Sequence, residues 1–587
     1  MLLPTLNEVA QSRINTEIFY GRNHNPKIGY GEWYETQNTC ASYYPLFCNR
    51  SKRGYVSSPN DPQGLLAKDA LMYIDGHQVI YNGLPVDGIT LSTDEDMLPK
   101  QMVSMGAYAV IFPDKVYINT ANLSDVGSLD AKYVAIDGLD ITAQMCRVDG
   151  SAYEVKDIGD VAPENPANGA YWIDTSTDVH VLKQYSDAQA MWIEIISTYV
   201  RIGATGVGIN FNVDDGVKIS GLAGNAQLEE LNTDNVIMAK GDDYIVITGI
   251  LDNVHEQEGG LVITRECPDM DYVTESNNRI WGCKYGMQDG KTVNEIYACK
   301  LGDFRNWRCY AGISTDSYAV SVGTDGRFTG AITHLGYPLF FKENCIHKIY
   351  GSMPSEYAMN TTMCRGVQLG SWRSLNIVNE VLYYHSRDGV VAYDGSLPVS
   401  VSDAFGIEKY KDAVAGSLGG VYYISMQGAD DAWHLFTYDT EKRIWHREDN
   451  THALCFANVR GDLMYIDADT KSIVSAKGIS GTPEGDIEWS AESGIMGYEY
   501  PDSKYISRYN IRVKLAEGAT LTMHLEYDSD GEWRDMGTYT GSAVLRTFTI
   551  PVIPRRCDHL RMKISGKGDV KIYSIARYLE GGSDHWL

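Results

Sequence analysis

Three residues in the run HSRDG (385–389) have side chains that could perform acid–base chemistry. His385, Arg387 and Asp388 lie close together in the sequence, between two runs rich in aromatic and β-branched residues. A tight turn between two strands also requires polar residues, and neighbouring side chains on such a turn point in different directions. The run therefore predicts a hairpin turn rather than a catalytic group.

Two other polar runs resemble binding motifs. LEYDSDGEW (525–533) has the carboxylate density of a calcium loop, and Arg460-Gly461-Asp462 matches a cell-adhesion tripeptide. A calcium loop of the EF-hand type needs further oxygen ligands and a distant bidentate Glu, and a sialidase Asp-box has a different spacing before its Trp. Both runs fit ordinary hairpin positions, and we predict no metal site.

Carboxylates are abundant, with 77 Asp and Glu residues. A glycosidase needs two of them facing each other across a cleft, one with a raised pKa, and sequence alone cannot select such a pair. No G-x-S-x-G elbow, P-loop or HExxH motif is present. We predict no catalytic residue, no cofactor and no enzymatic activity, with a propeller glycoside hydrolase as an alternative.

The 11 cysteines are scattered singly from Cys40 to Cys557 and include no CxxC pair. Their odd number and wide spacing favour reduced, buried and inert thiols, with a zinc site as the alternative.

Composition and charge restrict the class of protein. The chain has 587 residues, 40 Tyr, 57 Gly and a formal net charge of −27. This length predicts several domains, and many Tyr and Gly residues are typical of strands joined by tight turns. Strong acidity argues against a surface that grips nucleic acid or anionic lipid. The sequence shows no apolar stretch long enough to span a membrane and no signal-peptide pattern at its start.

Short hairpin patterns recur along much of the chain. Apolar, Tyr-rich runs flank a polar turn near 68–82, 106–118, 277–299, 336–350, 381–393, 416–438 and 460–476. Spacing of this kind is typical of propeller blades, which bury their faces by stacking around an axis. A β-sandwich or open meander would show similar hairpins. We predict an all-β fold: a roughly seven-bladed β-propeller with an inserted β module and a C-terminal β-sandwich.

The hairpin rhythm also predicts the domain limits. Residues 1–60 lack a sustained period and predict an N-terminal extended arm, and 61–139 hold the first blades. The rhythm stops over 140–265, which predicts an inserted β module, and resumes over 266–480 for the remaining blades. Residues 481–587 alternate apolar and polar side chains, as strands of a sandwich do.

Two groups of aromatic residues are candidates for ligand or subunit contacts. Tyr171, Trp172 and Trp192 in the insert could form a sugar-stacking platform, although filling the core of a small module is the simpler interpretation. Trp33, Tyr43 and Tyr44 in the arm could anchor a neighbouring subunit, because aromatic residues are enriched at interfaces.

One stretch resembles a known family. TESNNRIWGCKYG…VNEIYACKLGDFRNW (274–307) is similar to the blade motif of bacteriophage tail nozzle and packaged-DNA-stabilisation proteins. In that motif an N-R-L-W strand precedes an L-G-D-x-x-N-W/F turn. Two following blades, GAITHLGYPLFFKENCIHKIYG (330–351) and SLNIVNEVLYYHSRDGVVAYDG (374–395), and the early YYPLFCNRSKRG (43–54) come in the family's order. The matching positions are Asn278, Arg279, Ile280, Trp281, Leu301, Gly302, Asp303, Phe304, Asn306 and Trp307.

The resemblance implies a structural virion protein of a phage tail, folded in the cytoplasm of the host bacterium. It implies a homo-oligomeric ring, commonly of six subunits, that forms a nozzle, hub or neck with other tail proteins. DNA would pass through an acidic lumen without specific binding, and no membrane would be involved. A tail adhesin that binds host polysaccharide is the alternative. The insert and the C-terminal sandwich depart from the family's pattern.

Overall fold

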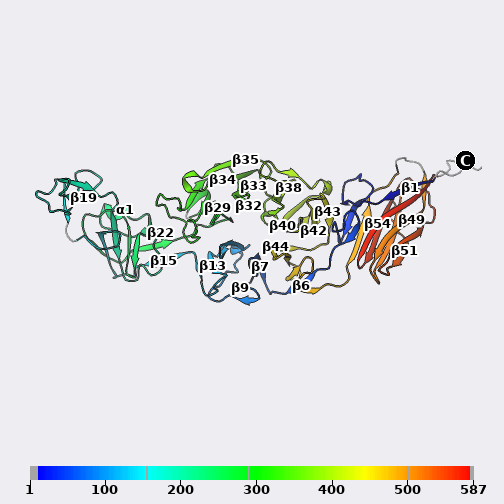
Figure 1. The fold of residues 1–587 in the computed structure, drawn as a ribbon, viewed down its shortest axis with the longest axis horizontal. Helices are drawn as coiled ribbons and strands as arrows, with labels where there is room; N and C mark the ends of the chain where they lie inside the picture. Colours follow the sequence, from blue (N-terminus) through cyan, green and yellow to red (C-terminus); the bar gives the residue numbers. More distant parts are fainter. Residues whose placement is uncertain (1–10, 154–155, 289, 499–502, 582–587) are drawn as a thin grey trace, which may run out of the picture.

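The protein is elongated and consists of three β-rich units in a row. The computed structural model describes residues 11–153, 156–288, 290–498 and 503–581. A seven-bladed propeller occupies the middle, the insert forms one end, and a sandwich made from both ends of the chain forms the other (Figure 1). The predicted all-β fold class, with propeller, inserted module and C-terminal sandwich, is confirmed.

Seven small antiparallel sheets form the blades of the propeller. Contacts link the innermost strands of most neighbouring blades, and the innermost strand of the last blade, β44 (Ala453–Val459), contacts that of the first, β7 (Pro62–Ala67), so that the circle closes. Each predicted hairpin supplies the two middle strands of one blade. The first three blades are formed by β7 (Pro62–Ala67), β8 (Leu71–Asp75), β9 (Gln78–Tyr81) and β10 (Leu84–Pro85); β11 (Gln101–Met105), β12 (Tyr108–Phe112), β13 (Val116–Asn119) and β14 (Val126–Ser128); and β28 (Tyr272–Ser276), β29 (Arg279–Gln288), β30 (Lys291–Ala298) and β31 (Tyr318–Ser321).

The remaining four blades follow without interruption. They contain β32 (Gly330–His334), β33 (Tyr337–Lys342), β34 (Cys345–Tyr350) and β35 (Ala358–Met363); β36 (Asn376–Val378), β37 (Val381–Ser386), β38 (Gly389–Tyr393) and β39 (Val399–Ser400); β40 (Tyr410–Leu418), β41 (Val421–Gly428), β42 (Trp433–Asp439) and β43 (Ile444–Arg447); and β44 (Ala453–Val459), β45 (Asp462–Asp467), β46 (Ser472–Ser475), β6 (Gly54–Ser57) and β47 (Thr482–Pro483). Short 3-10 turns lie at η1 (Glu95–Met97), η2 (Pro354–Glu356), η3 (Trp372–Ser374) and η4 (Asp403–Phe405).

The hairpin at HSRDG illustrates why these sequences form blades. Strands β37 and β38 pair in antiparallel register from Leu382 opposite Tyr393 to Ser386 opposite Gly389. Gly389 has a φ of +126°, and a Cβ at this position would collide with the hydroxyl of Ser402. Only glycine accepts that backbone and that close approach. The turn thus brings two strands together that bury their apolar side chains against the neighbouring blades.

Strand β6 closes the propeller. It precedes the first blade in sequence, yet it pairs with β46 and β47 in the last one. A blade built from both ends of the propeller chain holds the ring shut, because opening it would expose the unpaired edges of both partners.

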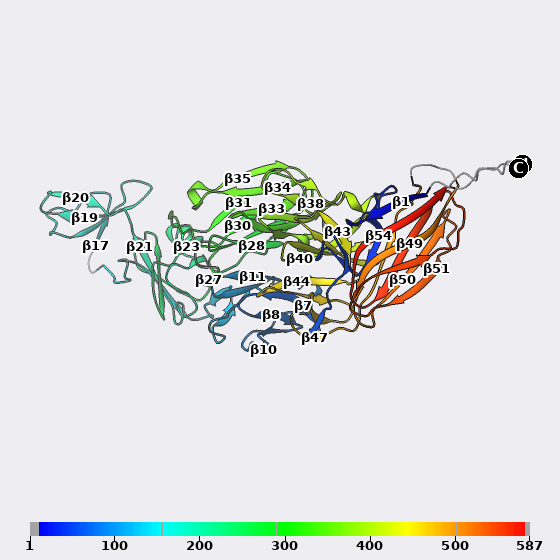
Figure 2. The same ribbon diagram turned by 45° about the vertical axis from the view of Figure 1, so that its right-hand side comes forward.

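The insert consists of two sheets around one core, with a third, four-stranded sheet at the tip of the molecule (Figure 2). The sequence predicts that it begins at residue 140. Its first strand is instead β15, which starts at Ala131 and pairs with β27, so that Ala131 lies opposite Arg265. The strands and the helix are β15 (Ala131–Val134), β16 (Asp140–Cys146), β17 (Lys156–Gly159), β18 (Tyr171–Asp174), β19 (Val181–Ser186), β20 (Met191–Glu194), β21 (Tyr199–Gly203), β22 (Gly216–Ser220), α1 (Ala226–Glu230), β23 (Asp234–Val236), β24 (Ala239–Gly241), β25 (Tyr244–Thr248), β26 (His255–Glu258) and β27 (Val262–Arg265).

The sandwich corrects the prediction of an N-terminal extended arm. Strands from the first 50 residues belong to its two six-stranded sheets and pair with strands of the C-terminal region. β1 lies beside β54, and β3 lies beside β48, because each completes an edge that the C-terminal strands leave open. The sheets contain β1 (Gln11–Thr16), β4 (Thr39–Cys40), β5 (Phe47–Asn49), β49 (Lys504–Leu515), β52 (Leu545–Pro551) and β54 (Val570–Gly581); and β2 (Gly21–Arg22), β3 (Glu32–Gln37), β48 (Glu488–Ser493), β50 (Thr520–Tyr527), β51 (Arg534–Thr540) and β53 (Leu560–Lys567).

Two clusters of charged side chains join the sandwich to the propeller. Arg22 contacts Glu35 at 3.0 Å and Glu408 at 2.8 Å. In the second cluster, Arg53 contacts Glu448 and Asp449, both at 2.7 Å. Both clusters link segments about 400 residues apart in sequence, so the joint depends on the complete fold.

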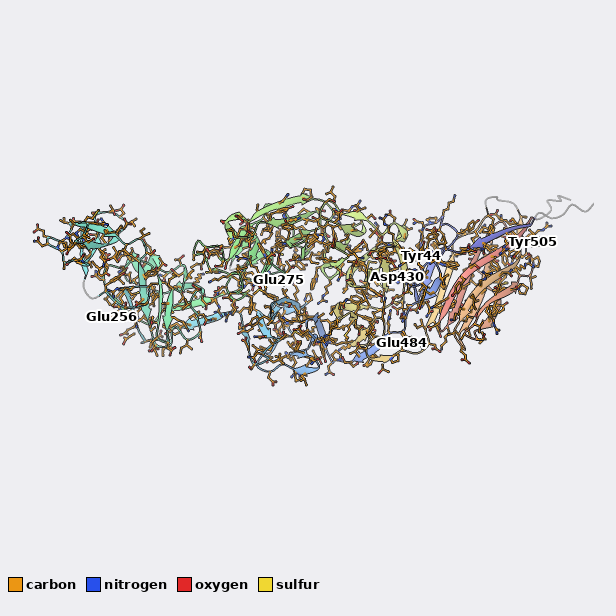
Figure 3. All side chains as sticks on the ribbon, in the orientation of Figure 1. Tyr44, Glu256, Glu275, Asp430, Glu484 and Tyr505 are labelled. Atoms are coloured by element: carbon orange, nitrogen blue, oxygen red, sulfur yellow. The ribbon has the colours of Figure 1, made fainter. Side chains whose placement is uncertain are left out.

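Glu484 belongs to the second cluster. Its carboxylate accepts from the backbone N–H of Arg53 at 2.7 Å and pairs with Arg50. Figure 3 places Glu484 and Tyr44 between the propeller and the sandwich.

In the described part of the chain, no helix has the length and apolar character needed to cross a bilayer.

Candidate functional site

The family-like motif of the third blade forms a buried clasp. Arg279 at the start of β29 is 1% exposed and donates to the carbonyl oxygens of Cys299, Asp316 and Ser314 at 2.7, 2.5 and 3.0 Å. One guanidinium thereby holds both ends of the long loop 299–317. Asn278 precedes it in the turn with a φ of +61° and accepts at its carbonyl from the N–H of Gly302 at 2.9 Å.

The L-G-D-x-x-N-W part of the motif shapes that loop. Gly302 has a φ of +75°, and the carboxylate of Asp303 accepts from the side chain of Asn306 at 2.6 Å. Trp307 is buried and donates its indole N–H to the carbonyl of Phe304 at 2.8 Å. Leu301 is 42% exposed.

The same loop attaches the insert to the propeller. Asn306 donates to Asp215 of the insert at 3.0 Å and accepts from the backbone N–H of Gly216, also at 3.0 Å. Asp215 is 1% exposed and is paired with Arg265 at 2.6 Å. A buried carboxylate is stable only with such partners, so these bonds fix the insert against the third blade.

Trp281, also part of the motif, lies in a blade core and not in the loop 299–317. It packs between Tyr318 and Tyr357, with ring centroids 6.0 and 5.1 Å away, in the core shared by the third and fourth blades. The motif residues that the structure brings together are therefore used for folding and for attachment of the insert.

The aromatic residues predicted in the insert lie on the sheet at the tip. Trp172 on β18 contacts Trp192 on β20 with centroids 5.4 Å apart, and Tyr185 on β19 contacts Trp192 at the same distance. Their register places all three on one face of the sheet, because Tyr185 lies directly opposite Trp192. No feature of the sequence singles out Tyr185, which becomes a neighbour of Trp192 only through strand pairing.

Tyr171 and Trp172, two of the predicted insert aromatics, do not form a common exposed surface. Tyr171 lies on the opposite face from Trp172 and contacts Tyr153 at 4.6 Å. Trp172 is 5% exposed and donates its indole N–H to Gly159 at 3.0 Å. Lys183 lies over the Trp172 ring at 5.1 Å and pairs with Asp174 at 2.7 Å. The half-buried Trp192 and Tyr185 are thus the accessible rings of this face, flanked by an ion pair.

The predicted interface aromatics near the N-terminus have different environments. Trp33 is 2% exposed in the sandwich core, where it packs on Phe19 and Phe47, so it is a core residue and not an exposed anchor. Tyr43 is 51% exposed, and its ring lies 3.3 Å from the ammonium of Lys571. Tyr44 is 36% exposed.

The polar runs singled out in the sequence serve as turns. His385 is buried, and burial lowers its pKa to about 4, whereas Arg387 and Asp388 of the same turn are exposed. In the 525–533 run, Asp530 pairs with Arg534, the residue that directly follows the run, at 2.8 Å. No cluster of three or more His, Cys, Asp or Glu side chains suited to a metal ion occurs in the described ranges.

Two of the cavities in the described part of the propeller could hold a ligand. The axial cavity of about 220 Å³ is lined by residues of the innermost strands such as Leu65, Val103 and Phe456, and its described lining includes no Asp or Glu. A larger cleft of about 800 Å³ lies between the second and third blades. Its lining carboxylates, Asp114, Asp269 and Asp271, each contact a lysine at 2.6, 2.7 and 2.9 Å, respectively.

Comparisons with known proteins show only distant similarity. No family model and no curated protein matches the chain. Among solved structures, an exo-β-1,3-galactanase from Phanerochaete chrysosporium is 7% identical, with a TM-score of 0.21, covering 51% of this chain and 94% of the galactanase. An engineered GH43 glycoside hydrolase with endo-xylanase and exo-arabinofuranosidase activity is 10% identical, with a TM-score of 0.20, covering 53% and 98%. A Trypanosoma rangeli sialidase is 10% identical, with a TM-score of 0.17, covering 89% and 95%.

These comparisons correct the prediction that the chain is not an enzyme. That prediction rested on the absence of G-x-S-x-G, P-loop and HExxH motifs, whereas the solved structures found in the comparison are glycoside hydrolases and a sialidase. TM-scores of 0.21 or less assign neither an active site nor a substrate to this chain.

Proposed function

We propose that this chain is a structural protein of a bacteriophage tail that assembles as a homo-oligomeric ring around the DNA channel. The support comes from the order of the family-like motifs in the sequence and, above all, from the three β units in a row (Figure 1). A ring or stack of identical subunits needs two different contact surfaces on each subunit. The insert at one end and the sandwich at the other are two such surfaces.

The charge distribution supports a subunit with two unlike ends. Residues 131–265 contain 21 Asp and Glu against 8 Lys and Arg, a formal charge of −13 of the total −27. Residues 504–581 contain 9 Asp and Glu against 13 Lys and Arg, a formal charge of +4. Opposite charges at the two ends favour contacts between an acidic end and a basic end over contacts between like ends.

Imaging tests this proposal directly. Purified protein and intact phage particles would be examined by electron microscopy, with mass spectrometry of the particles to identify the chain. We expect a ring, commonly of six subunits, coaxial with a tail and in contact with other tail proteins. A monomer at all concentrations that is also absent from particles would contradict the proposal.

The acidic surface also bears on DNA. Tight binding to DNA depends on the release of counterions from the phosphates, and this release requires an excess of Lys and Arg at the contact. A protein that lets DNA pass must therefore lack such a basic contact surface. We expect no retention of double-stranded DNA by the purified protein, even at low salt, and tight retention would contradict a passive channel.

A second candidate function is binding of bacterial cell-surface polysaccharide at the tip of the insert. It is favoured by the sheet face that carries Trp192 and Tyr185 beside the Asp174–Lys183 ion pair. Aromatic faces present apolar area to the C–H groups of a sugar, and neighbouring charged groups can bond its hydroxyls.

Substitution of the accessible rings tests this second function. We expect Trp192→Ala with Tyr185→Ala to abolish retention on host polysaccharide while leaving ring assembly intact. Trp433→Ala, which removes a ring stacked on His452 in the propeller, serves as the control. Unchanged retention by the double variant would exclude the tip as the binding site.

A further inference from the structure

Two cysteines face each other at the joint between the sandwich and the propeller. Cys40 on β4 and Cys48 on β5 are directly opposite in an antiparallel pair, and their sulfur atoms are 3.6 Å apart. Both are thiols in the structure. A disulfide requires a sulfur–sulfur distance of about 2 Å, so a small rotation of the side chains would bring the two atoms to bonding distance.

The two thiols have different environments. Cys40 is half-buried and lines a cavity of about 320 Å³ together with Ser42, Arg50 and Lys442. Cys48 is 1% exposed and lies in the middle of the sheet, between β4 and β54. A reagent in the cavity can therefore meet Cys40 but not Cys48.

Hydrogen bonds increase the reactivity of the accessible thiol. The hydrogen bond with Cys48, and further bonds with the hydroxyl and backbone of Ser42, lower the pKa of Cys40 to about 7. The bond to Cys40, together with burial, raises the pKa of Cys48. Since the thiolate is the nucleophile, Cys40 is the attacking sulfur and Cys48 the resolving one.

We propose that Cys40 and Cys48 form a redox-active dithiol that reacts with small-molecule disulfides entering the cavity beside Cys40. The Cys40 thiolate attacks one sulfur of the small disulfide, whose S–S bond breaks and releases a thiolate. Cys48 then loses its proton to solvent and attacks the Cys40 sulfur of the mixed disulfide, expelling the second thiolate. Two protein thiols are oxidised to one disulfide, and one small disulfide is reduced to two thiols.

The position of the pair links its redox state to the joint. The hydroxyl of Thr39, next to Cys40, lies 2.8 Å from Nδ1 of His446 on β43. Asn38 donates its backbone N–H to the backbone carbonyl of Glu448 of the propeller at 2.6 Å. Bonding Cys40 to Cys48 ties β4, the edge strand that makes these contacts, to the sheet behind it. Oxidation therefore stiffens the connection between propeller and sandwich.

Mass spectrometry of the full-length protein tests the reaction, with 2-hydroxyethyl disulfide as the probe. We expect the oxidised protein to lose two hydrogen atoms in intact mass and to yield a Cys40–Cys48 linked peptide after non-reducing digestion. Cys48→Ser should instead retain one hydroxyethylthio group on Cys40, and Cys40→Ser should not react at this position. Absence of the linked peptide, or no trapped adduct in Cys48→Ser, would overturn the proposal.

A second measurement does not depend on any variant. Cys364 is the other half-buried cysteine, and burial raises its pKa to about 11. At neutral pH we expect iodoacetamide to label Cys40 on the order of tens of times faster than Cys364, after allowance for the lower nucleophilicity of a more acidic thiol. Cys364→Ser, the matched control, should oxidise like the wild type. Equal labelling rates would contradict the assigned attacking sulfur.

Discussion

Arg279 shows how a single buried side chain can organise a whole loop. Its guanidinium supplies donors to three carbonyl groups from loop 299–317, and the side chain is almost completely buried. Replacing it by Met would leave these carbonyls without donors, at a cost of about 1–3 kcal/mol for each unsatisfied group. We therefore expect Arg279→Met to lower the free energy of unfolding of the propeller by about 3 kcal/mol or more, measured by urea denaturation.

The matched control is Arg327→Met. Arg327 is exposed beside the larger propeller cleft, so its replacement should change stability by no more than about 0.5 kcal/mol. Equal effects of the two substitutions would contradict the role of Arg279 as a clasp.

His446 makes the joint sensitive to acid. Burial lowers its pKa to about 4, and burial likewise lowers the pKa of His347 and His385 to about 4. Between the unfolded pKa of about 6.5 and the folded value, the unfolded chain binds more protons, so stability falls as the pH falls. Each such histidine contributes at most about 1.4 kcal/mol per pH unit in this range.

We expect the wild type to lose stability steadily from pH 6.5 to 5, and His446→Gln to lose it less steeply. Urea midpoints measured at several pH values would give the two slopes. Asp449 does not interfere in this pH range. Burial raises the pKa of its carboxyl, but Arg53 lowers it, with a net pKa of about 2. The stability that Asp449 contributes is therefore lost only below its unfolded pKa of about 4. Identical slopes for wild type and variant would contradict the assignment.

Only part of the candidate site could be predicted at the residue level. Trp172 and Trp192 stand out in the sequence because tryptophan is scarce, with 11 in the chain. Tyr185 is one of 40 tyrosines, and nothing marks it until strand pairing places it opposite Trp192. Cys40 and Cys48 were missed for the same reason, since their proximity depends on the β4–β5 pairing and not on a CxxC spacing.

At the scale of elements, local patterns were predictable and long-range pairings were not. A blade hairpin such as β37–β38 joins neighbouring residues through a Gly turn, so its signal lies within a few positions of sequence. Strands β1, β3 and β5 pair with partners that lie more than 400 residues away, and no local pattern records such a partner. The segment therefore looked like an arm without a core of its own.

Strand β6 offers a test of how the propeller is closed. Tyr55 lies between Val474 of β46 and Thr482 of β47, and its side chain is 46% exposed. Proline at this position removes a backbone donor from a strand with partners on both sides, and the loss of a hydrogen-bond partner costs about 1–3 kcal/mol. We expect Tyr55→Pro to destabilise the propeller by about this amount, as measured by its thermal or urea transition.

Tyr55→Phe is the control, because it keeps the backbone N–H and nearly the same shape. It loses only the hydrogen bond to Ser58, so its effect should be small. If proline and phenylalanine had equal effects, β6 would not be required for closure.

At the scale of the whole molecule, the insert is separable from the rest. Ala131 and Arg265 lie opposite each other, so a short Gly-Ser linker can bridge the gap that its removal leaves. The insert also has a core of its own, distinct from the cores of the blades beside it. We expect a protein lacking residues 131–265 to retain the propeller and the sandwich, checked by circular dichroism and thermal melting.

Removal of the insert should also change the charge. The formal net charge would fall in magnitude from −27 to −14, because the insert contributes −13. The shortened protein should therefore elute from an anion exchanger at lower salt. Aggregated or unfolded product would show instead that the bonds of Asp215 to Asn306 are needed by the propeller itself.

The pairing of β1 with β54 has a practical consequence for labelling. The first and last described strands lie side by side on the sandwich, at the pole opposite the tip sheet (Figures 1 and 2). A gold-binding tag or fluorescent protein fused to either terminus would mark that one pole. In averaged images, the distance of the tag from the ring axis and its height along that axis would then report which way each subunit points. The tag would leave the aromatic face at the far end unaltered.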